Sequence, residues 1–327
     1  MRIITDINAL PAVSQDLSRG SVLTLGNFDG VHLGHQALIL TTIAKAKKLG
    51  LPALAVTFDP HPLRVLKGDA APLQLLSLQC KLEYFAALGL DLALVLHFTT
   101  ATATMEADDF VRDILCDSLH SRFLVLGYDY AFGKGRRGNA ALLGEMGKIL
   151  GFGVKEVPAL LIGDKAVSST SIRKSLQAGA VRAAASMLGR PHFVQGKVGK
   201  GDGRGHLLGF PTANLLPDDN ILLPRKGVYA VLAEINPPEL ELGPQNDSSR
   251  IFQPGIANVG ENPTFGGVSL RVETHLLNFN ADLYDQTFRV HFIEGLREER
   301  KFASADELIQ QIHHDVQRAK EIMPPSL

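Results

Sequence analysis

The sequence has few cysteines, no excess of either charge and no long apolar run. Its two cysteines are Cys80 and Cys116, too few for a disulfide framework or a cysteine metal site, and a reducing compartment fits them. The net charge of −1 gives no field that would draw the chain to nucleic acid or an anionic membrane. No run approaches the 18 apolar residues of a spanning helix, and the first residues lack a signal-peptide core. We therefore expect a cytoplasmic protein without nucleic-acid or membrane partners.

The length of 327 residues suggests two domains, and up to residue 176 apolar strand-like runs alternate with helical segments. The strands are expected at 22–25, 51–58, 91–98, 123–127 and 154–160, and the helices at 36–49, 78–88, 107–119, 139–150 and from 169 onward. This alternation predicts an α/β domain with a parallel sheet covered on both faces. In such sheets ligands bind beyond the carboxyl ends of the strands.

After about residue 185 the pattern changes to strands without intervening helices. The segments are 193–198, 227–235, 270–279 and 287–296, and the polar segment 236–250 is expected to be a hairpin loop. They predict an antiparallel sheet or a small β-barrel. A terminal amphipathic helix is expected over 304–323, with Ser304 as N-cap and Glu307 completing a capping box. We therefore place the domains at 1–185 and 186–327.

The segment GNFDGVHLGH, Gly26 to His35, is the most informative in the chain. It connects an apolar strand to a helix, and helix N-termini bind phosphate through free backbone N–H groups. Glycines let the backbone approach a ligand closely. His32 and His35 lie three residues apart, on one face of the first turn, where both can donate to phosphate oxygens. The expected phosphate-binding residues in this turn are Gly26, Asn27, Phe28 and Gly34.

Three further segments follow strands and are expected at the same edge of the sheet: 57–62, 127–133 and 167–176. In the last of them Ser169 or Thr170 can cap a helix, and Arg173 offers a planar fork suited to phosphate. A glycine turn, paired histidines, helix N-termini and an arginine predict a nucleotidyl transfer site. A phosphate oxygen would attack the α-phosphate of a nucleotide, and catalysis would rest on positioning and charge stabilisation.

Two other patterns carry less weight. The loop GKGRRG, 133–138, matches G-x-G-x-x-G but does not follow the first strand of a βαβ unit, so we expect a basic loop rather than a dinucleotide site. The chain contains no G-x-x-x-x-G-K-[ST] motif, which excludes a P-loop protein. His313 and His314 on the terminal helix are expected to be solvated.

A second candidate site lies in the C-terminal half. Glycines at 199, 201, 203 and 205 form a loop that can wrap phosphates through backbone N–H groups, so Gly201, Gly203 and Gly205 are expected to bind ATP. Thr212 and Asn214 share a face if extended, and their oxygens suit Mg²⁺ held with nucleotide phosphates. Glu273, within an apolar strand, is the candidate general base. The alternative interpretation is a glycine hairpin with a solvated strand glutamate.

These motifs, taken in order, resemble the bifunctional prokaryotic riboflavin kinase/FMN adenylyltransferase family. Segments 26–35, 57–62, 127–133 and 168–173 resemble its Rossmann-like nucleotidyltransferase module. Segments 188–198, 201–215, 225–231, 255–265 and 272–279 resemble its β-barrel kinase module. The resemblance implies that the chain converts riboflavin to FMN and FMN to FAD, with ATP as co-substrate and Mg²⁺ as cofactor.

The resemblance also implies roles for individual residues. His32, His35, Ser169, Thr170 and Arg173 would bind the ATP phosphates during adenylylation. Asp129 would help to hold the flavin. In the kinase, Thr212 and Asn214 would serve Mg²⁺–ATP, and Glu273 would take the proton from the ribityl 5′-hydroxyl of riboflavin.

The chain departs from the family pattern at Tyr130, Asn278, His206 and Tyr284–Asp285. None of these residues is assigned a role in either reaction. The changes at Asn278 and His206 are expected to bear on the affinity for flavin or nucleotide. Two other functions stay open. One is an adenylyl- or cytidylyltransferase for another phosphorylated alcohol, and the other is a non-catalytic flavin-binding regulator. The sequence also leaves the oligomeric state open, self-association included.

Overall fold

The structure, a computed structural model, describes residues 1–5, 17–199, 205, 208–218, 220–237, 251–264 and 267–323. It divides into two compact units, Met1–Val167 and Ser168–Leu327, which are described separately as the N-terminal and the C-terminal unit. The predicted domain boundary at 185/186 falls inside helix α9 (Val181–Leu188). This helix packs against helix α8 (Ser169–Gln177) and against strands β9 (His192–Gly199) and β14 (Thr287–Arg297).

The N-terminal unit contains a parallel sheet, as predicted, with strand order β1-β4-β3-β2-β5-β6. The central strand β2 is buried along its whole length, because a parallel sheet is covered on both faces. β1 was not predicted, and β6 ends three residues before the predicted strand does. The strands are β1 (Arg2–Ile4), β2 (Ser21–Leu25), β3 (Ala53–Asp59), β4 (Leu92–His97), β5 (Ser121–Gly127) and β6 (Gly153–Val157).

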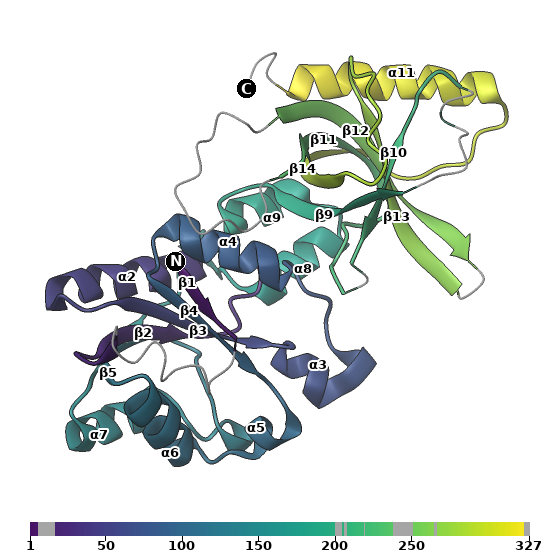
Figure 1. The fold of residues 1–327 in the computed structure, drawn as a ribbon. Coiled ribbons are helices and arrows are strands. Elements are labelled where there is room, and N and C mark those ends of the chain that lie inside the picture. Colours follow the sequence, from purple (N-terminus) through teal and green to yellow (C-terminus); the bar gives the residue numbers. More distant parts are fainter. Residues whose placement is uncertain are drawn as a thin grey trace. The chain divides into compact units, whose positions relative to one another are not determined.

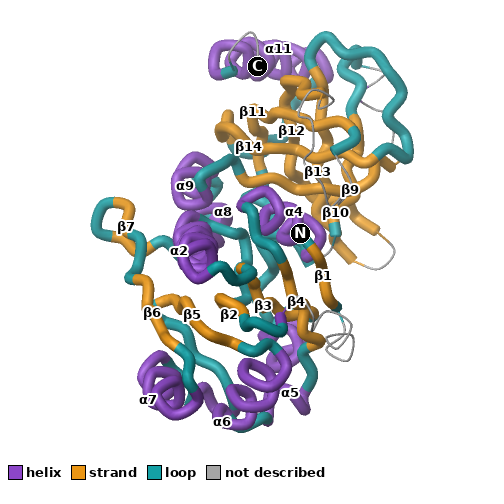
Figure 2. The backbone as a smooth tube through the Cα atoms, turned by 60° about the vertical axis from the view of Figure 1, so that its left-hand side comes forward, coloured by secondary structure: helices purple, strands orange, loops and turns teal. Residues whose placement is uncertain are grey.

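Helices cover both faces of this sheet. α2 and α4 lie on one face, and α6 and α7 lie on the other (Figures 1 and 2). The predicted helix 107–119 forms, but most of it, Phe110–Ser118, is a π-helix. A short antiparallel hairpin, β7 (Leu161–Ile162) and β8 (Lys165–Ala166), ends the unit. The helices are α2 (Leu33–Leu49), α3 (Pro62–Lys67), α4 (Leu78–Leu88), α5 (Thr100–Thr104), α6 (Ala107–Asp109) and α7 (Ala140–Leu150).

The strand order reverses between β2 and β5. From β2 the chain moves through β3 to β4 on one side of the sheet, and then returns to place β5 and β6 on the other side. Such a reversal leaves a crevice at the carboxyl ends of the two strands, which is where open α/β sheets bind ligands. The segments that follow β2 and β5 begin with Gly26 and Tyr128, so both candidate loops start at this crevice.

The C-terminal unit contains a closed antiparallel barrel with strand order β10-β13-β12-β11-β14-β9, which confirms the predicted small barrel. Strands β10 and β12 were not among the predicted segments. Residues 238–250, the greater part of the predicted hairpin loop, lie outside the described residues. The remaining barrel strands are β10 (Ala213–Pro217), β11 (Gly227–Ile235), β12 (Ile251–Thr264) and β13 (Gly267–Leu276).

The terminal helix α11 (Ala305–Ile322) packs on the outside of the barrel (Figure 1). Its predicted N-cap is confirmed, since the Ser304 hydroxyl accepts a hydrogen bond from the Glu307 N–H at 3.2 Å. Ala319 and Met323 bury their side chains against Val228 and Ala230 of β11. A buried ion pair adds to this packing, because Arg297 Nε on β14 donates to Asp315 Oδ2 at 2.8 Å.

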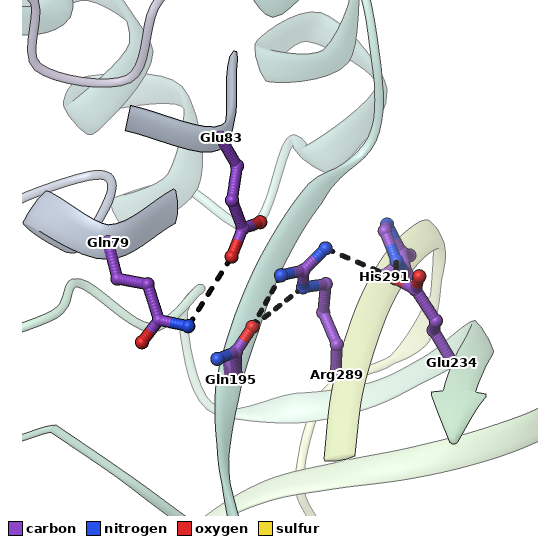
Figure 3. Close-up of polar contacts among 6 residues, drawn as sticks. All are labelled: Gln79, Glu83, Gln195, Glu234, Arg289 and His291. Atoms are coloured by element: carbon purple, nitrogen blue, oxygen red, sulfur yellow. Dashed lines mark hydrogen bonds and ion pairs between the residues drawn. The ribbon is translucent and has the colours of Figure 1, made fainter. Parts of the chain in front are cut away.

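A second buried ion pair joins three neighbouring strands of the barrel (Figure 3). Arg289 on β14 donates from Nη1 to Glu234 Oε2 on β11 at 3.3 Å, with side-chain exposures of 6% and 1%. The same carboxylate oxygen lies 3.3 Å from Nε2 of His291. The other nitrogens of Arg289 donate to Gln195 Oε1 on β9, and its guanidinium lies over the ring of Phe193, 4.5 Å from the centroid. Figure 3 also draws Gln79 and Glu83, which hydrogen-bond one turn apart on α4.

Removing one partner of the Arg289–Glu234 pair should destabilise the barrel. Arg289→Met leaves a buried carboxylate without its cation, and such losses cost about 3–5 kcal/mol. Replacing both partners, in Arg289→Met with Glu234→Leu, should cost less, because no buried charge remains. Hydrogen–deuterium exchange of the barrel strands in the full chain measures both effects. Equal protection in the wild type and in Arg289→Met would show that the pair does not stabilise the barrel.

Candidate functional site

The turn between β2 and α2 holds several residues in the left-handed backbone region. Phe28 has φ of 49° and Val31 has φ of 40°, while Gly30 has φ of 82°. Side chains disfavour this region, and strain of this kind persists where the surroundings hold it. Phe28 and Val31 are both 0% exposed, so core packing fixes the turn. The strained backbone lies within the predicted strand-to-helix turn, the candidate phosphate-binding segment.

His32 is the N-cap of α2. Its Nδ1 accepts a hydrogen bond from the His35 backbone N–H at 3.3 Å, which requires Nδ1 to be unprotonated and places the imidazole proton on Nε2. Gly34 makes room for this cap, since a Cβ there would lie 3.2 Å from the His32 ring. The first turn of α2 is therefore built so that His32 presents an N–H donor.

His35 stacks on His32, with ring centroids 3.6 Å apart and an interplanar angle of 16°. Burial lowers the pKa of His35 well below 6.5, and electrostatic interactions with the His32 imidazole and with Lys81 lower it further. Its Nδ1 is buried and has no hydrogen-bond partner among the residues that the structure describes. An orphaned buried polar atom is costly in a native protein, and a bound ligand is one way to satisfy it.

Hydrogen bonds to other parts of the N-terminal unit hold the turn in place. Thr57 on β3 donates from Oγ1 to the Asn27 carbonyl oxygen at 3.3 Å. Asp29 Oδ1 accepts from the Leu75 N–H at 2.9 Å, which ties the turn to the segment before α4. Lys81 on α4 donates from Nζ to Thr57 Oγ1 at 3.3 Å. The sequence analysis missed Lys81, and no local pattern marks it, because an isolated helical lysine is normally a solvated residue.

The loop after β5 places Asp129 at the crevice. Asp129 is exposed, and the Tyr130 N–H closes a turn by donating to the Gly127 carbonyl at 3.0 Å. The ring of Tyr130 stacks on Phe132 with centroids 5.7 Å apart, and burial raises the pKa of its hydroxyl. Tyr130, which replaces the usual phenylalanine, therefore fills an aromatic packing position. The proposed flavin contact of Asp129 stays a prediction.

Helix α8 begins at Ser169, as predicted, but its N-cap is not one of the two predicted residues. Its N-cap is Ser168, whose hydroxyl accepts from the Ser171 N–H at 3.1 Å, and not Ser169 or Thr170. The cap lies one residue earlier because Ser168 is the residue with extended backbone, at φ −151° and ψ 155°. Ser169 and Thr170 are therefore the first two helical residues, and Arg173 follows one turn later. Their expected phosphate contacts stay predictions.

The basic loop Gly133–Gly138 forms a tight turn. Phe132 and Gly138 pair as an isolated bridge, and a Cβ at Gly138 would lie 2.6 Å from the Phe132 ring. Lys134 forms an ion pair with Glu106 at 2.9 Å, and both side chains are about half exposed. The glycines are thus required by a solvated turn after β5. This agrees with the expectation of a basic loop rather than a dinucleotide site.

In the C-terminal unit, the barrel register brings the predicted kinase residues together. Asn214 on β10 is the register partner of Glu273 on β13, and Glu273 is in turn the partner of Asn258 on β12. Directly opposed residues have Cβ atoms about 4.5–5.5 Å apart, so these three side chains stand side by side on one face of the barrel. Asn214 is 7% exposed. Asn258 was missed because its strand was not predicted.

The loop before β10 packs closely on itself. Phe210 N–H donates to the Gly205 carbonyl at 2.8 Å, and a Cβ at Gly205 would lie 2.4 Å from the Phe210 oxygen and 3.3 Å from Thr212 Oγ1. His275, two residues after Glu273, lies with Nδ1 2.9 Å from the Pro211 carbonyl oxygen. Because a carbonyl can only accept, this nitrogen of His275 carries a proton. Glycine at 205 and His275 therefore fix the backbone that carries Thr212.

Phe210 also contacts the terminal helix. Its ring lies edge-on to His275 and to His313 of α11, with centroids 5.4 Å and 5.1 Å apart. His313 and His314 are exposed, as expected, and the ring of His313 in addition packs edge-on against Phe210. Among the described residues, no group of three or more His, Cys, Asp or Glu side chains is arranged to hold a metal.

Several predicted positions lie outside the described residues: Gly201, Gly203 and His206. Two departures from the family pattern have a backbone explanation. Asn278 has φ of 54° and Asp285 has φ of 61°, a region that asparagine, aspartate and glycine tolerate best. Both residues thus adopt the left-handed backbone conformation that the turns between β13 and β14 require. Every helix in the described part of the chain is too short or too polar to cross a membrane.

Comparisons with known proteins match both units. The FAD synthetase family model matches residues 14–171, and the riboflavin kinase family model matches residues 188–323. The bifunctional riboflavin kinase/FMN adenylyltransferase of Escherichia coli K12 is 38% identical over 98% of this chain and 97% of its own length. The enzyme of the same name from Bacillus subtilis 168 is 35% identical over 91% of each chain.

Among solved structures, a crystal structure titled macrolide-efflux protein, from Streptococcus pneumoniae, superposes with a TM-score of 0.81. It is 30% identical, and the match covers 92% of this chain and 94% of that chain. The similarity therefore extends through both the parallel sheet and the barrel.

We expect His35 to stay neutral at pH values where an exposed imidazole is protonated. A histidine in an unfolded chain titrates near 6.5, and the folded pKa of His35 is lower. Below about pH 6.5 the unfolded state therefore binds more protons than the folded state does. The free energy of unfolding then falls as the pH drops from about 6.5 toward the folded pKa of His35. Imidazole ¹⁵N NMR of the full chain measures this, with His35→Asn identifying the signals. Protonation of His35 at pH 6.5 or above would contradict the expectation.

Proposed function

Because the chain belongs to the bifunctional riboflavin kinase/FMN adenylyltransferase family, we propose that the β2–α2 turn and the Glu273 strand carry its two active sites. The enzyme phosphorylates riboflavin with ATP to FMN and adenylylates FMN with ATP to FAD, releasing pyrophosphate. The FAD synthetase match covers the parallel sheet, and the riboflavin kinase match covers the barrel. The observation that carries the assignment is that each matched region contains one cluster of the predicted site residues.

In adenylyl transfer, a phosphate oxygen of FMN attacks the α-phosphorus of ATP, and the bond to the pyrophosphate leaving group breaks. His32 donates from Nε2 to phosphate oxygens, and His35 supplies a second imidazole 3.6 Å away. The backbone from Gly26 to Phe28 and the glycine at 34 bring the N–H groups of the α2 start close to the phosphates. Ser169, Thr170 and Arg173 add donors, and Asp129 contacts the flavin. Donors fixed in advance lower the barrier because they need no reorganisation during the reaction.

In the kinase reaction, the ribityl 5′-oxygen of riboflavin attacks the γ-phosphorus of ATP, and ADP leaves. The carboxylate of Glu273 takes the 5′-hydroxyl proton as the new oxygen–phosphorus bond forms. Asn214 and Asn258 flank Glu273 in the register, so their side chains lie beside its carboxylate on the same face of the barrel. We propose that Gly205, together with Gly201 and Gly203, binds the ATP phosphates.

The residues near Glu273 also fit a magnesium ion. Thr212 Oγ1 and Asn214 Oδ1 are hard oxygen donors, and Mg²⁺ is usually bound by few protein ligands together with substrate phosphates. When bound, Mg²⁺ would neutralise phosphate charge. The dependence on ATP favours the cytoplasm as the compartment.

His32 should be required for FAD formation and not for FMN formation. His32→Ala removes both the N-cap and the phosphate donor, whereas His32→Asn keeps a good N-cap without the imidazole. Both variants should lose FAD formation from supplied FMN by about 10²–10³-fold, the usual cost of one such donor. Chromatography of flavins over time measures both reactions. If His32→Asn restores FAD formation, His32 acts only as a cap; loss of FMN formation as well would contradict the separation of the two sites.

Glu273 should be required for FMN formation alone. Glu273→Gln keeps the shape of the side chain but cannot accept the proton, so FMN formation should fall by about 10²–10⁴-fold while supplied FMN is still converted to FAD. Glu321→Gln, an exposed change at the end of α11, is the matched control. A kinase rate in Glu273→Gln equal to that of the control would remove Glu273 as the base.

A further inference from the structure

Lys81 is a buried lysine whose position conflicts with two general preferences. It is 4% exposed, although lysine is almost never fully buried without a partner. It also follows the N-cap Ser77 by four residues, near the positive end of α4, where a cation is disfavoured. Residues that break local rules in this way tend to mark functional sites.

The contacts of Lys81 lead to the phosphate-binding turn. Within the described part of the chain its hydrogen-bond partner is Thr57 Oγ1, at 3.3 Å, and Thr57 donates in turn to the Asn27 carbonyl at 3.3 Å. The donation from Lys81 directs the hydroxyl hydrogen of Thr57 toward Asn27. A helix, a strand and the turn are thereby joined in one chain of hydrogen bonds.

The charges around Lys81 form a compact group. Asp29 in the turn and Asp59 at the end of β3 favour its charged form, while burial lowers its pKa. The charge of Lys81 also contributes to lowering the pKa of His35, after burial and His32, so the two side chains interact electrostatically. An ammonium has three N–H donors, so donors beyond the one given to Thr57 can serve an anion.

We propose that Lys81 is a positioning residue of the adenylyltransferase site, holding the Gly26–Gly30 turn through Thr57 and supplying positive charge beneath the bound phosphates. It acts on His35 across the site and on Asn27 through one hydroxyl group. The proposal rests on the proposed phosphate-binding role of His32 and His35. It adds the ammonium of Lys81, on α4, to a site that the motifs place at the start of α2.

The test compares Lys81→Met, which keeps the aliphatic stem, with Lys81→Arg, which keeps the charge, and with the exposed control Lys48→Met on α2. With supplied FMN, Lys81→Met should lower kcat/KM for ATP by about 10- to 100-fold, since small displacements at a reacting centre cost this much. Lys81→Arg should recover part of the loss, and Lys48→Met should match the wild type. FMN formation from riboflavin should be unchanged in all three.

Imidazole ¹⁵N NMR supplies a second measurement that packing alone would not change. In Lys81→Met, His35 should become protonated at a higher pH than in the wild type, because one positive neighbour is gone while Asp29, Asp59 and His32 remain. In Lys81→Arg it should titrate as in the wild type. Should Lys81→Met fail to fold, Thr57→Val tests the same hydrogen-bond chain, with an expected loss of about tenfold in adenylylation.

An adenylylation rate for folded Lys81→Met within twofold of the wild type would overturn the proposal. So would a loss of activity with an unchanged His35 titration, since Lys81 would then contribute only packing. These outcomes are separate from failure of the proposed function. If His32→Ala retained full FAD formation, the histidine assignment would fall whatever the His35 titration in Lys81→Met showed.

Discussion

Between Leu25 and Leu33 the chain must leave a buried strand, expose backbone N–H groups and enter a helix. It does so through Phe28 and Val31, which adopt the left-handed backbone region only because their side chains are fully buried. The polar atoms of this turn are then held by Thr57 and Asp29. The positions of both histidines follow from this geometry, because His32 caps helix α2 and His35 lies in its first turn. The crevice at the carboxyl ends of β2 and β5 is thus shaped mainly by buried side chains, and the polar groups add to it.

The barrel positions its proposed site residues through strand register. Antiparallel register places Asn214, Glu273 and Asn258 abreast on three adjacent strands, so a reactive carboxylate is held by rigid strands rather than by a loop. The residues before β10 are then fixed by the close approach at Gly205 and by the proton that His275 shares with the Pro211 carbonyl. In both units the proposed site residues lie at regular elements, His32 and His35 at the start of α2 and Glu273 on β13.

Much of this could be predicted from the sequence, and the limits have physical causes. The parallel sheet, the barrel and His32, His35, Asn214 and Glu273 follow from apolar periodicity and from motifs, which are local. Strands β10 and β12 were missed because one is short and the other contains two prolines and two glycines, so neither shows alternation. The N-cap of α8 was misplaced by one residue, since consecutive serines and a threonine all cap well.

What the sequence could not give are contacts between distant elements. Lys81 lies on an ordinary amphipathic helix, and only the fold places its ammonium against Thr57, 24 residues earlier. Asn258 and His275 likewise acquire a role through register and through the path of the loop before β10. Buried polar groups of this kind leave no periodic trace, because their partners are set by topology rather than by spacing.

The strand order also bears on how the protein behaves at high concentration. A closed barrel has no free edge, and the parallel sheet ends in β1, which is 3 residues long with Arg2 exposed, and in β6, where Lys155 and Glu156 face solvent. Short or charged edges are poor templates for a strand from another chain. The long apolar strands β2, β3 and β4 are all interior to the sheet. Aggregation through edge-to-edge strand pairing is therefore disfavoured in the folded protein, and becomes a hazard only when the sheet opens.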